Sequence, residues 1–398
     1  MNDRLGIGKE SENKIPVGPL ALIALPGCED FAERVDAYLG MWRHDRDVKH
    51  PGYKKESYII DVVLPRFGSG EAKGVLKSSV RGDDLFIMAD VTNYNIKYRM
   101  YGRENPMSPD DHFQNLKRVI AAASGKARRI TVIMPFLYES RQHRRTSRES
   151  LDCAMALEEL VYMGVNCIMT LDAHDPRVQN AIPLSGFENV TATYQFIKAL
   201  LREEKDLQID AEHMMVISPD EGAVSRAIYF ASMMGLDVGM FYKRRDYTKI
   251  VNGRNPIVAH EFLGSSVEGK DVIVVDDMIA SGDSAIDVAR QLKMRKARKV
   301  FLCSTFGLFT SGMERFDEAV KAGYIDRIFT TNAIYQSPEI LRRPYYSSVD
   351  MSKYIALFID TMNHDLSIEP LLSPVNRIHA RLDRYREKQK ERNGGAAQ

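Results

Sequence analysis

The stretch DVIVVDDMIASGDSAIDVARQL, residues 271–292, decides how this chain folds. Its apolar run at 272–275 is rich in β-branched residues and is typical of a buried parallel strand. Asp276 and Asp277 follow it, a loop of small residues comes next, and apolar residues then recur at helical spacing over 285–292. A strand, two carboxylates, a small loop and a helix start together predict a binding site for a phosphorylated sugar.

The physical basis of this prediction is the chemistry of the loop. Backbone N–H groups of a loop and first helical turn point toward an anion, and the helix dipole favours negative charge there. The two carboxylates can accept hydrogen bonds from sugar hydroxyls, directly or through a metal ion. The alternative is a surface turn with two solvated acids. Because open α/β sheets bind ligands at the carboxyl ends of their strands, the position favours the binding site.

The stretch resembles the ribose-phosphate loop of the type I phosphoribosyltransferase superfamily, whose pattern is D-D-x-x-D-T-x-G-T. Both leading acids and both hydroxyl positions of that pattern are kept, at Asp276, Asp277, Ser281 and Ser284. Two positions depart, since Ala280 replaces an acid and Asp283 replaces a glycine. A carboxylate facing a bound phosphate would repel it, so we expect Asp283 to point away and to cap the helix that begins near Ala285.

Composition places the chain among multidomain globular proteins. Its 398 residues suit two to three domains, 44% of them are hydrophobic, and the net charge of +1 indicates neither nucleic acid nor membrane as a partner. The four cysteines are far apart and show no metal-binding spacing, so we expect reduced core thiols. The polar start is unlike a signal peptide, and no apolar run is long enough to span a membrane. These features predict a cytoplasmic protein.

Strands alternate with helical segments along the chain, which predicts an α/β protein with two tandem doubly wound, mostly parallel-sheet domains. The expected domains are 18–185 and 186–372, followed by a basic helical tail at 373–398. An irregular, polar insertion is expected at 95–107. The expected strands are 20–25, 58–64, 85–88, 130–134 and 167–171 in the first domain, and 214–217, 238–242, 272–275, 300–303 and 328–329 in the second.

Several predicted strand ends carry polar clusters, and these make the resemblance specific. The chain resembles the ribose-phosphate pyrophosphokinase (phosphoribosyl-pyrophosphate synthetase) family over about residues 18–372. The matching segments stand in the family's order: FGSGE, VRGDDLFIM, MPFLYESRQ, SRES, LDAH, SPDEGA, YKRR, VVDDMIASGDS and TFGLF. The resemblance implies two phosphoribosyltransferase-like domains, ATP and ribose 5-phosphate as substrates, Mg²⁺ as cofactor and a homo-oligomer.

On the ATP side, the resemblance implies a composite site. Phe67 and Glu71 match a hairpin that reaches a neighbouring subunit's adenine site, with Ser69 replacing an Asn or Asp. Arg141 and Gln142 match a pair that binds ATP. Two further positions belong here: His174 matches a metal and ATP contact, and His143 stands where the family has an acid.

On the ribose side, the resemblance implies a binding loop and a pair of catalytic cations. Lys243 and Arg245 match cations of a loop that clamps the transferred group. Asp220 matches a second acid linked to the metal, so the metal-binding residues are His174 and Asp220. The residues implied to hold ribose 5-phosphate are Asp220, Asp276, Asp277, Ser281, Gly282 and Ser284.

Two other functions remain open from the sequence. A simple phosphoribosyltransferase would share the ribose-phosphate loop but would need neither Arg141 and Gln142 nor His174. A non-catalytic homologue would keep the fold, and the departures at Ser69, His143, Ala280 and Asp283 leave room for it. The retained cations and metal-linked residues favour the synthetase.

Overall fold

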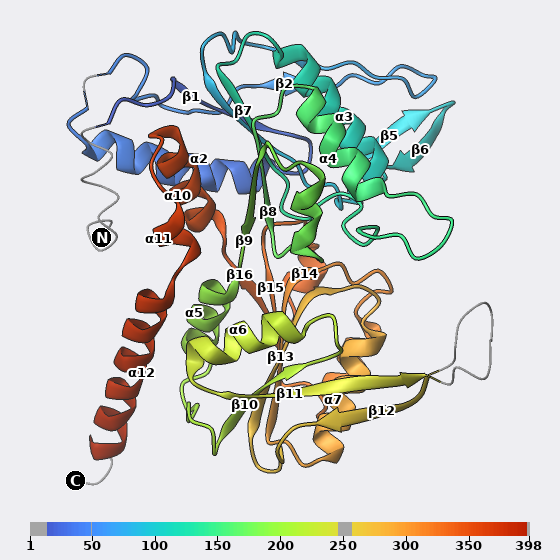
Figure 1. Ribbon diagram of the computed structural model, residues 1–398, viewed down its shortest axis with the longest axis vertical. Helices are drawn as coiled ribbons and strands as arrows, with labels where there is room; N and C mark the ends of the chain where they lie inside the picture. Colours follow the sequence, from blue (N-terminus) through green and yellow to red (C-terminus); the bar gives the residue numbers. More distant parts are fainter. Residues whose placement is uncertain (1–13, 49, 246–256, 396–398) are drawn as a thin grey trace. The chain divides into compact units, whose positions relative to one another are not determined.

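The computed structural model describes residues 14–48, 50–245 and 257–395, which divide into two compact units (Figure 1). The first unit holds the chain as far as Thr191 together with Asn332–Tyr335 and Asp350–Ser373. The second unit holds Ala192–Thr331, Gln336–Val349 and the chain from Pro374 onward. Each unit has its own sheet and its own core, as expected for an α/β chain of this length.

The first unit is built on a five-stranded parallel sheet with the order β1-β4-β7-β8-β9. Beside β1, on the edge away from β4, a further parallel bridge joins Leu22 to Ile59. After β1 the chain first pairs with one side of β1, through Ile59, and then crosses over to form β4 on the other side. The β1/β4 junction is therefore a topological switch point. The strands are β1 (Leu20–Ala24), β4 (Asp84–Met88), β7 (Arg129–Ile133), β8 (Cys167–Leu171) and β9 (Gly186–Val190).

Two antiparallel hairpins extend the first unit. One pairs β2 (Val62–Val63) with β3 (Val75–Leu76), so the strand expected over 58–64 is mostly loop. The other pairs β5 (Lys97–Met100) with β6 (Arg103–Pro106). The expectation of an irregular insertion at 95–107 is therefore wrong. The helices of this unit are α2 (Glu29–Asp45), α3 (Pro109–Ala123), α4 (Asp152–Tyr162), η2 (Pro176–Ala181), α10 (Ser352–Asn363) and α11 (Glu369–Leu372).

The second unit has a seven-stranded sheet with the order β12-β11-β10-β13-β14-β15-β16, in which only β12 is antiparallel to its neighbour. The chain moves outward from β10 to β12 and then returns to place β13 beside β10. The β10/β13 junction is thus the switch point of this sheet. The strands are β10 (Met214–Ser218), β11 (Asp237–Arg245), β12 (Ile257–Leu263), β13 (Asp271–Ile279), β14 (Lys299–Gly307), β15 (Arg327–Thr331) and β16 (Tyr346–Val349).

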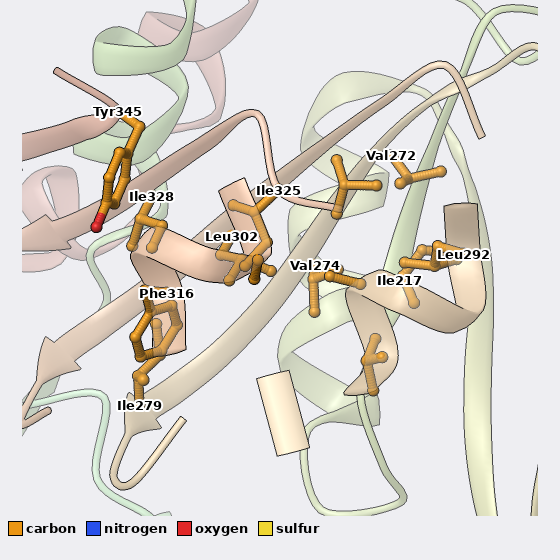
Figure 2. Close-up of a cluster of buried hydrophobic side chains, with 14 of the residues drawn as sticks. Ile217, Val272, Val274, Ile279, Leu292, Leu302, Phe316, Ile325, Ile328 and Tyr345 are labelled. Atoms are coloured by element: carbon orange, nitrogen blue, oxygen red, sulfur yellow. The ribbon is translucent and has the colours of Figure 1, made fainter. Parts of the chain in front are cut away.

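Apolar side chains from the central strands form the core of the second unit (Figure 2). Val272 and Val274 are two residues apart on β13 and lie on one face of the sheet, where Leu292 from helix α7 packs with them. Both valines and the leucine are almost fully buried. This cluster fixes α7 against the sheet and so determines where its first turn lies. The helices of this unit are α5 (Thr193–Glu203), α6 (Val224–Met234), α7 (Asp283–Met294), α8 (Glu314–Lys321), α9 (Pro338–Leu341) and α12 (Val375–Gly395).

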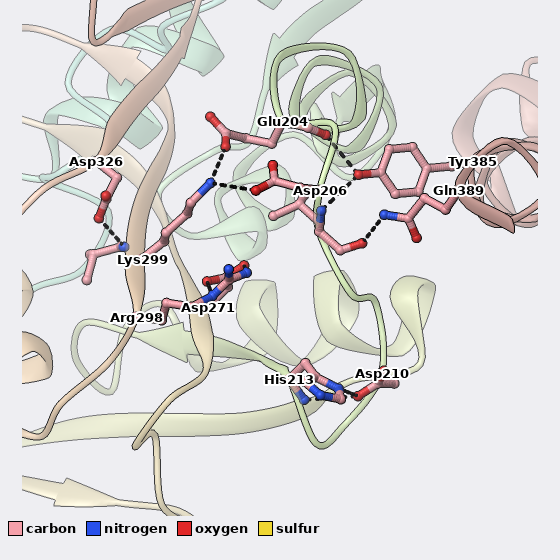
Figure 3. A network of polar contacts seen from close by, with 12 residues as sticks. Glu204, Asp206, Asp210, His213, Asp271, Arg298, Lys299, Asp326, Tyr385 and Gln389 are labelled. Atoms are coloured by element: carbon pink, nitrogen blue, oxygen red, sulfur yellow. Dashed lines mark hydrogen bonds and ion pairs between the residues drawn. The ribbon is translucent and has the colours of Figure 1, made fainter. Parts of the chain in front are cut away.

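The C-terminal helix α12 packs against α5 and α6 of the second unit. Tyr385 accepts the N–H of Leu207 and donates its hydroxyl to the carbonyl of Glu204, as Figure 3 shows. The Glu204 carboxylate in turn holds Lys299 at 2.9 Å. The packed face of the helix is apolar, since Ile378 and Leu382 are both buried.

The division of the chain differs from the domains expected at 18–185 and 186–372, because Asp350–Ser373 belongs to the first unit. Helix α10 packs on α2, where Arg43 forms a buried ion pair with Asp360 at 3.1 Å. Asn363 donates to the Asp84 carboxylate at 2.8 Å. These buried partners are far away in sequence, so local patterns could not indicate which core this helix joins.

Candidate functional site

The acidic pair lies within strand β13, next to β10 at the switch point of the second unit. The strand was expected to stop at residue 275, but it continues to Ile279 because β14 is equally long. In that pairing Asp276 lies opposite Ser304. The extension places both carboxylates at the carboxyl end of the sheet, where open α/β folds bind their ligands.

The carboxylates form a cluster whose charges oppose one another. Burial raises the pKa of Asp276 well above its usual range, and the negative charges of Asp277 and Asp220 raise it further. The nearby Arg226 guanidinium acts in the opposite direction on the same pKa. Asp276 also accepts the backbone N–H of Asp277 at 2.8 Å. A buried acidic cluster of this kind favours a bound cation or the hydroxyl donors of a ligand.

The loop after β13 turns into helix α7 at Gly282. This glycine has a φ of +92°, and a Cβ there would lie 2.4 Å from the Phe316 ring, so both the turn and the packing require glycine. Helix α7 is twelve residues long and begins immediately afterwards. Ser281 and Ser284 flank the turn at the N-terminus of α7, the position that the sequence predicts for phosphate.

Asp283 does not have the capping role that the sequence predicted. Helix α7 begins at Asp283 itself, and its N-cap residue is Gly282, without a side-chain cap hydrogen bond. The Asp283 carboxylate is exposed and forms an ion pair with Arg315, which precedes Phe316 on α8. It also accepts the Ser281 hydroxyl at 3.2 Å. The capping prediction failed because Gly282, one position earlier, makes the left-handed turn.

Asp220 occupies the turn that follows β10. The buried Ser218 hydroxyl donates to the carbonyl oxygen of Asp220 at 2.6 Å, and the Asp220 carboxylate accepts the N–H of Gly222 at 3.0 Å. The turn therefore holds this carboxylate in one orientation beside Asp276. Ser218 and Arg226 were missed by the sequence analysis. Their only signals were a serine at a strand end and a basic residue in the first turn of the next helix.

The predicted catalytic cations are at the end of β11, the parallel neighbour of β10. Lys243 pairs with His260 and Arg245 with Ile257 across the β11–β12 ladder, which is irregular between Arg244 and Arg245. The strand is four residues longer than β10, and its extra residues carry the cations. The residues 246–256 that follow lie outside the described part of the chain.

In the first unit, the predicted ATP residues follow β7 and β8. Gln142 donates its amide to the carbonyl of Ser150 at 2.9 Å, while Arg141 is exposed. His174 is exposed, and its ring centroid lies 5.4 Å from that of His143. The structure thus brings together the segments around Arg141 and His174.

His143 also lies beside the Asp175 carboxylate. The His143 Nε2 atom is 3.5 Å from that carboxylate. Hydrogen bonds from Arg177 are the main reason why the pKa of Asp175 is lowered to about 2. Asp175 is therefore ionised at neutral pH.

The FGSGE segment forms the tip of the hairpin that includes β2 and β3. The N–H of Phe67 donates to the Glu71 carbonyl at 2.8 Å, and the Ser69 hydroxyl donates to the Glu71 carboxylate at the same distance. The Phe67 side chain is 54% exposed, although it is a large apolar group at a polar tip. This exposure agrees with a contact residue for a ligand or a partner.

Sequence profiles place the chain among known proteins. A profile of the N-terminal domain of ribose phosphate pyrophosphokinase matches residues 20–164, and a profile of the phosphoribosyl synthetase-associated domain matches residues 248–372. The chain belongs to the ribose-phosphate pyrophosphokinase family.

Individual members of the family agree with this assignment. The ribose-phosphate pyrophosphokinase of Vibrio cholerae is 27% identical and that of Shewanella oneidensis is 28% identical, each over 79% of this chain and 91% of the relative. The phosphoribosylpyrophosphate synthetase of Mycobacterium smegmatis has a similar fold, with a TM-score of 0.69 at 21% identity. That match covers 87% of this chain and 99% of the other. The predicted fold class, two α/β units of phosphoribosyltransferase type, is confirmed.

Proposed function

We propose that this ribose-phosphate pyrophosphokinase family member transfers the pyrophosphoryl group of ATP to the anomeric hydroxyl of ribose 5-phosphate. The hydroxyl oxygen forms a bond to the β-phosphorus as the bond between that phosphorus and the α,β-bridging oxygen breaks. AMP leaves with the bridging oxygen, the hydroxyl proton passes to solvent, and phosphoribosyl pyrophosphate is the product. The observation that carries the proposal is the acidic pair at the β10/β13 switch point of a chain that belongs to this family.

The second unit supplies the groups suited to the sugar. Asp276 and Asp277 accept the ribose hydroxyls, and the turn of Ser281, Gly282 and Ser284 at the start of α7 binds the 5-phosphate. Backbone N–H groups and the helix dipole favour that anion. The negative charge of Asp283 is partly neutralised by its ion pair with Arg315, which lessens the repulsion of the phosphate.

The first unit supplies the groups suited to ATP. Arg141 presents a planar guanidinium that can pair with phosphate or stack on adenine, and Gln142 holds the segment in place through Ser150. Phe67 and Glu71 contact the adenine of a neighbouring subunit's site, which requires a homo-oligomer. Lys243 and Arg245 stabilise the negative charge that develops on the transferred group, the usual means of catalysis in phosphoryl transfer.

Mg²⁺ is the proposed cofactor, with Asp220 and His174 as the protein groups that would contact it. Among the described residues, no three His, Cys, Asp or Glu side chains are arranged to enclose a metal ion. Mg²⁺ usually binds through one or two carboxylates and the substrate phosphates. The oriented Asp220 carboxylate suits this role, and the bound ion would neutralise phosphate charge.

In the described part of the chain, no helix is long and apolar enough to cross a membrane. We propose a cytoplasmic location, where ATP and ribose 5-phosphate are both available to the site.

The proposal is tested by incubating the full chain with ATP, ribose 5-phosphate and Mg²⁺ and separating the nucleotides. We expect equal amounts of AMP and phosphoribosyl pyrophosphate, which phosphorus NMR distinguishes from the ADP of simple phosphoryl transfer. Omission of ribose 5-phosphate is the control and should abolish AMP formation. AMP formation without the sugar would instead indicate a nucleotide hydrolase, and a folded chain that forms no AMP would be a non-catalytic homologue.

A further inference from the structure

The β5–β6 hairpin lies against the hairpin that carries Phe67 and Glu71. The N–H of Tyr101, in the turn of β5–β6, donates to the carbonyl of Gly68 at 2.9 Å. A Cβ on Gly70 would be only 2.6 Å from the Met100 sulfur, so the two hairpins are in close contact at this point.

The side chains of β5 alternate in a way that suits this contact. Tyr98 and Met100 are partly buried, whereas Lys97 and Arg99 are exposed. Because neighbouring residues of a strand point to opposite faces, one face of β5 is covered and the other meets solvent. The turn is also specific, with φ of +48° at Tyr101 and +77° at Gly102, as in the two-residue turns that join twisted strands.

Arg66 connects the two hairpins to the rest of the first unit. Its guanidinium carbon lies 4.1 Å from the centre of the Tyr98 ring, within the range of a cation–π interaction. The same guanidinium donates to the Gly70 carbonyl at 3.1 Å and forms an ion pair with Asp111, also at 3.1 Å.

Asp111 is itself fixed, because it belongs to the capping box with Ser108 at the start of α3. Helix α3 is thus connected through Asp111 and Arg66 to the tip of the FGSGE hairpin, and the Tyr98 ring lies under the central guanidinium. These contacts form one continuous series from the start of α3 to the hairpin tip.

We infer that the β5–β6 hairpin, with Tyr98 and Arg66, positions the Phe67–Glu71 tip for nucleotide binding. This inference rests on the proposed function, in which the tip contacts the adenine of ATP. Held at both Gly68 and Gly70, the tip keeps one conformation before the nucleotide arrives. Less ordering entropy is then lost on binding, so the hairpin acts on ATP affinity and not on the chemical step.

The β5–β6 hairpin can be removed without breaking the hydrogen bond at its base. The N–H of Met107 donates to the carbonyl of Ile96 at 2.8 Å, so the two ends of the hairpin are already paired. Replacing residues 97–106 by Asn-Gly would close this pair with a two-residue turn. A second, milder variant is Tyr98→Leu, which removes the ring under Arg66. Arg99→Ala, on the exposed face of the same strand, is the matched control.

The affinity of each variant for ATP is measured by isothermal titration calorimetry, beside the KM for both substrates and kcat. We expect the deletion to weaken ATP binding by roughly tenfold and Tyr98→Leu by severalfold, with kcat and the KM for ribose 5-phosphate unchanged. Hydrogen exchange at the N–H groups of Phe67 and Gly70 should become faster in the deletion. Arg99→Ala should match the wild type.

A folded deletion variant with wild-type ATP affinity would overturn the inference, as would equal losses in ATP affinity and in kcat. The calorimetric comparison does not depend on turnover. If the wild type binds ATP but forms no AMP, the proposed reaction fails while the effect of the hairpin on ATP affinity is still measured. Unchanged hydrogen exchange in the deletion would also count against positioning.

Discussion

Each of the two units contains a topological switch point, and the carboxylates near the two points have different surroundings. At the β1/β4 junction, the Asp90 carboxylate accepts the N–H of Tyr335 at 2.7 Å and both the N–H and hydroxyl of Thr92. At the β10/β13 junction, burial raises the pKa of Asp276, and the neighbouring carboxylates of Asp277 and Asp220 raise it further. Burial raises the pKa of Asp90 too, but its hydrogen bonds act to lower it.

The difference shows that sheet topology creates a candidate site without deciding that it is used. Asp90 is 3% exposed and is satisfied by donors from its own chain. The segment Asn332–Tyr335 supplies one of those donors from more than two hundred residues away. The second unit instead gathers several carboxylates at one end of its sheet, an arrangement that suits donors or cations from a ligand.

The largest expected effect concerns Lys243 and Arg245 at the end of β11, the neighbour of β10 in the second sheet. Lys243→Ala or Arg245→Ala should lower kcat by two or more decades with small changes in KM. Loss of one group that stabilises transition-state charge typically costs about 3–4 kcal/mol. Steady-state kinetics measures this split, and a raised KM with unchanged kcat would show that these residues serve only to bind substrate.

The second prediction uses the opposing charges at Asp276. Asp276→Asn should reduce kcat/KM for ribose 5-phosphate by roughly a hundredfold, because the amide accepts only part of the sugar hydrogen bonding. Asp237→Asn is the control and should leave kcat/KM unchanged. Asp237 is exposed at the start of β11, whereas Asp276 lies near the carboxyl end of β13.

Asp276→Asn should also be more stable than the wild type, by an amount that depends on pH. The folded protein holds the Asp276 proton more tightly than the unfolded chain does, so the free energy of unfolding falls as pH rises above about 4. Asp276→Asn removes that loss. Its Tm should therefore exceed the wild-type Tm at pH 7.5 and converge with it near pH 4. A lower Tm at pH 7.5 would contradict the acidic-cluster description.

Asp90→Ala in the first unit should lower stability and leave activity nearly unchanged, the reverse of what we expect for Asp276→Asn. It leaves the N–H groups of Tyr335 and Thr92 without their acceptor, which should cost about 2–3 kcal/mol, or roughly 5 °C in Tm. Activity of the folded protein should stay within about twofold, because Asp90 contacts no proposed substrate group. Thr92→Val, which removes only one of the three donors, should cost less. A large loss of kcat in a stable Asp90→Ala protein would mean that both switch points serve catalysis.

The smallest expected effect concerns Asp283 and its partner. Arg315→Ala should raise the KM for ribose 5-phosphate by a few fold at low ionic strength, because the Asp283 carboxylate would lose its neutralising ion pair beside the phosphate loop. High salt, or the additional change Asp283→Gly, should restore the KM. Both side chains are more than half exposed, so stability should change by less than about 1 kcal/mol. An unchanged KM in Arg315→Ala at low salt would show that Asp283 does not affect the phosphate.

The sequence by itself determined the features that depend on neighbouring residues. The strand at 167–171 and the acidic pair at the carboxyl end of the second sheet follow from apolar periodicity and from the turn residues beside them. The same local signals, in their order along the chain, indicated the family. The predicted site residues Asp220 and Asp276 also lie together, because strands β10 and β13 are paired.

Only the tertiary structure decided the features that depend on distant partners. Asp360 and Asn363 assign α10 to the first unit through Arg43 and Asp84, more than 270 residues away. Asp283 is paired with Arg315, and Asp90 is satisfied by Tyr335, although neither contact leaves a periodic signal. A buried charge or polar group must find a partner wherever the fold provides one, and that choice is made in space after the local elements have formed.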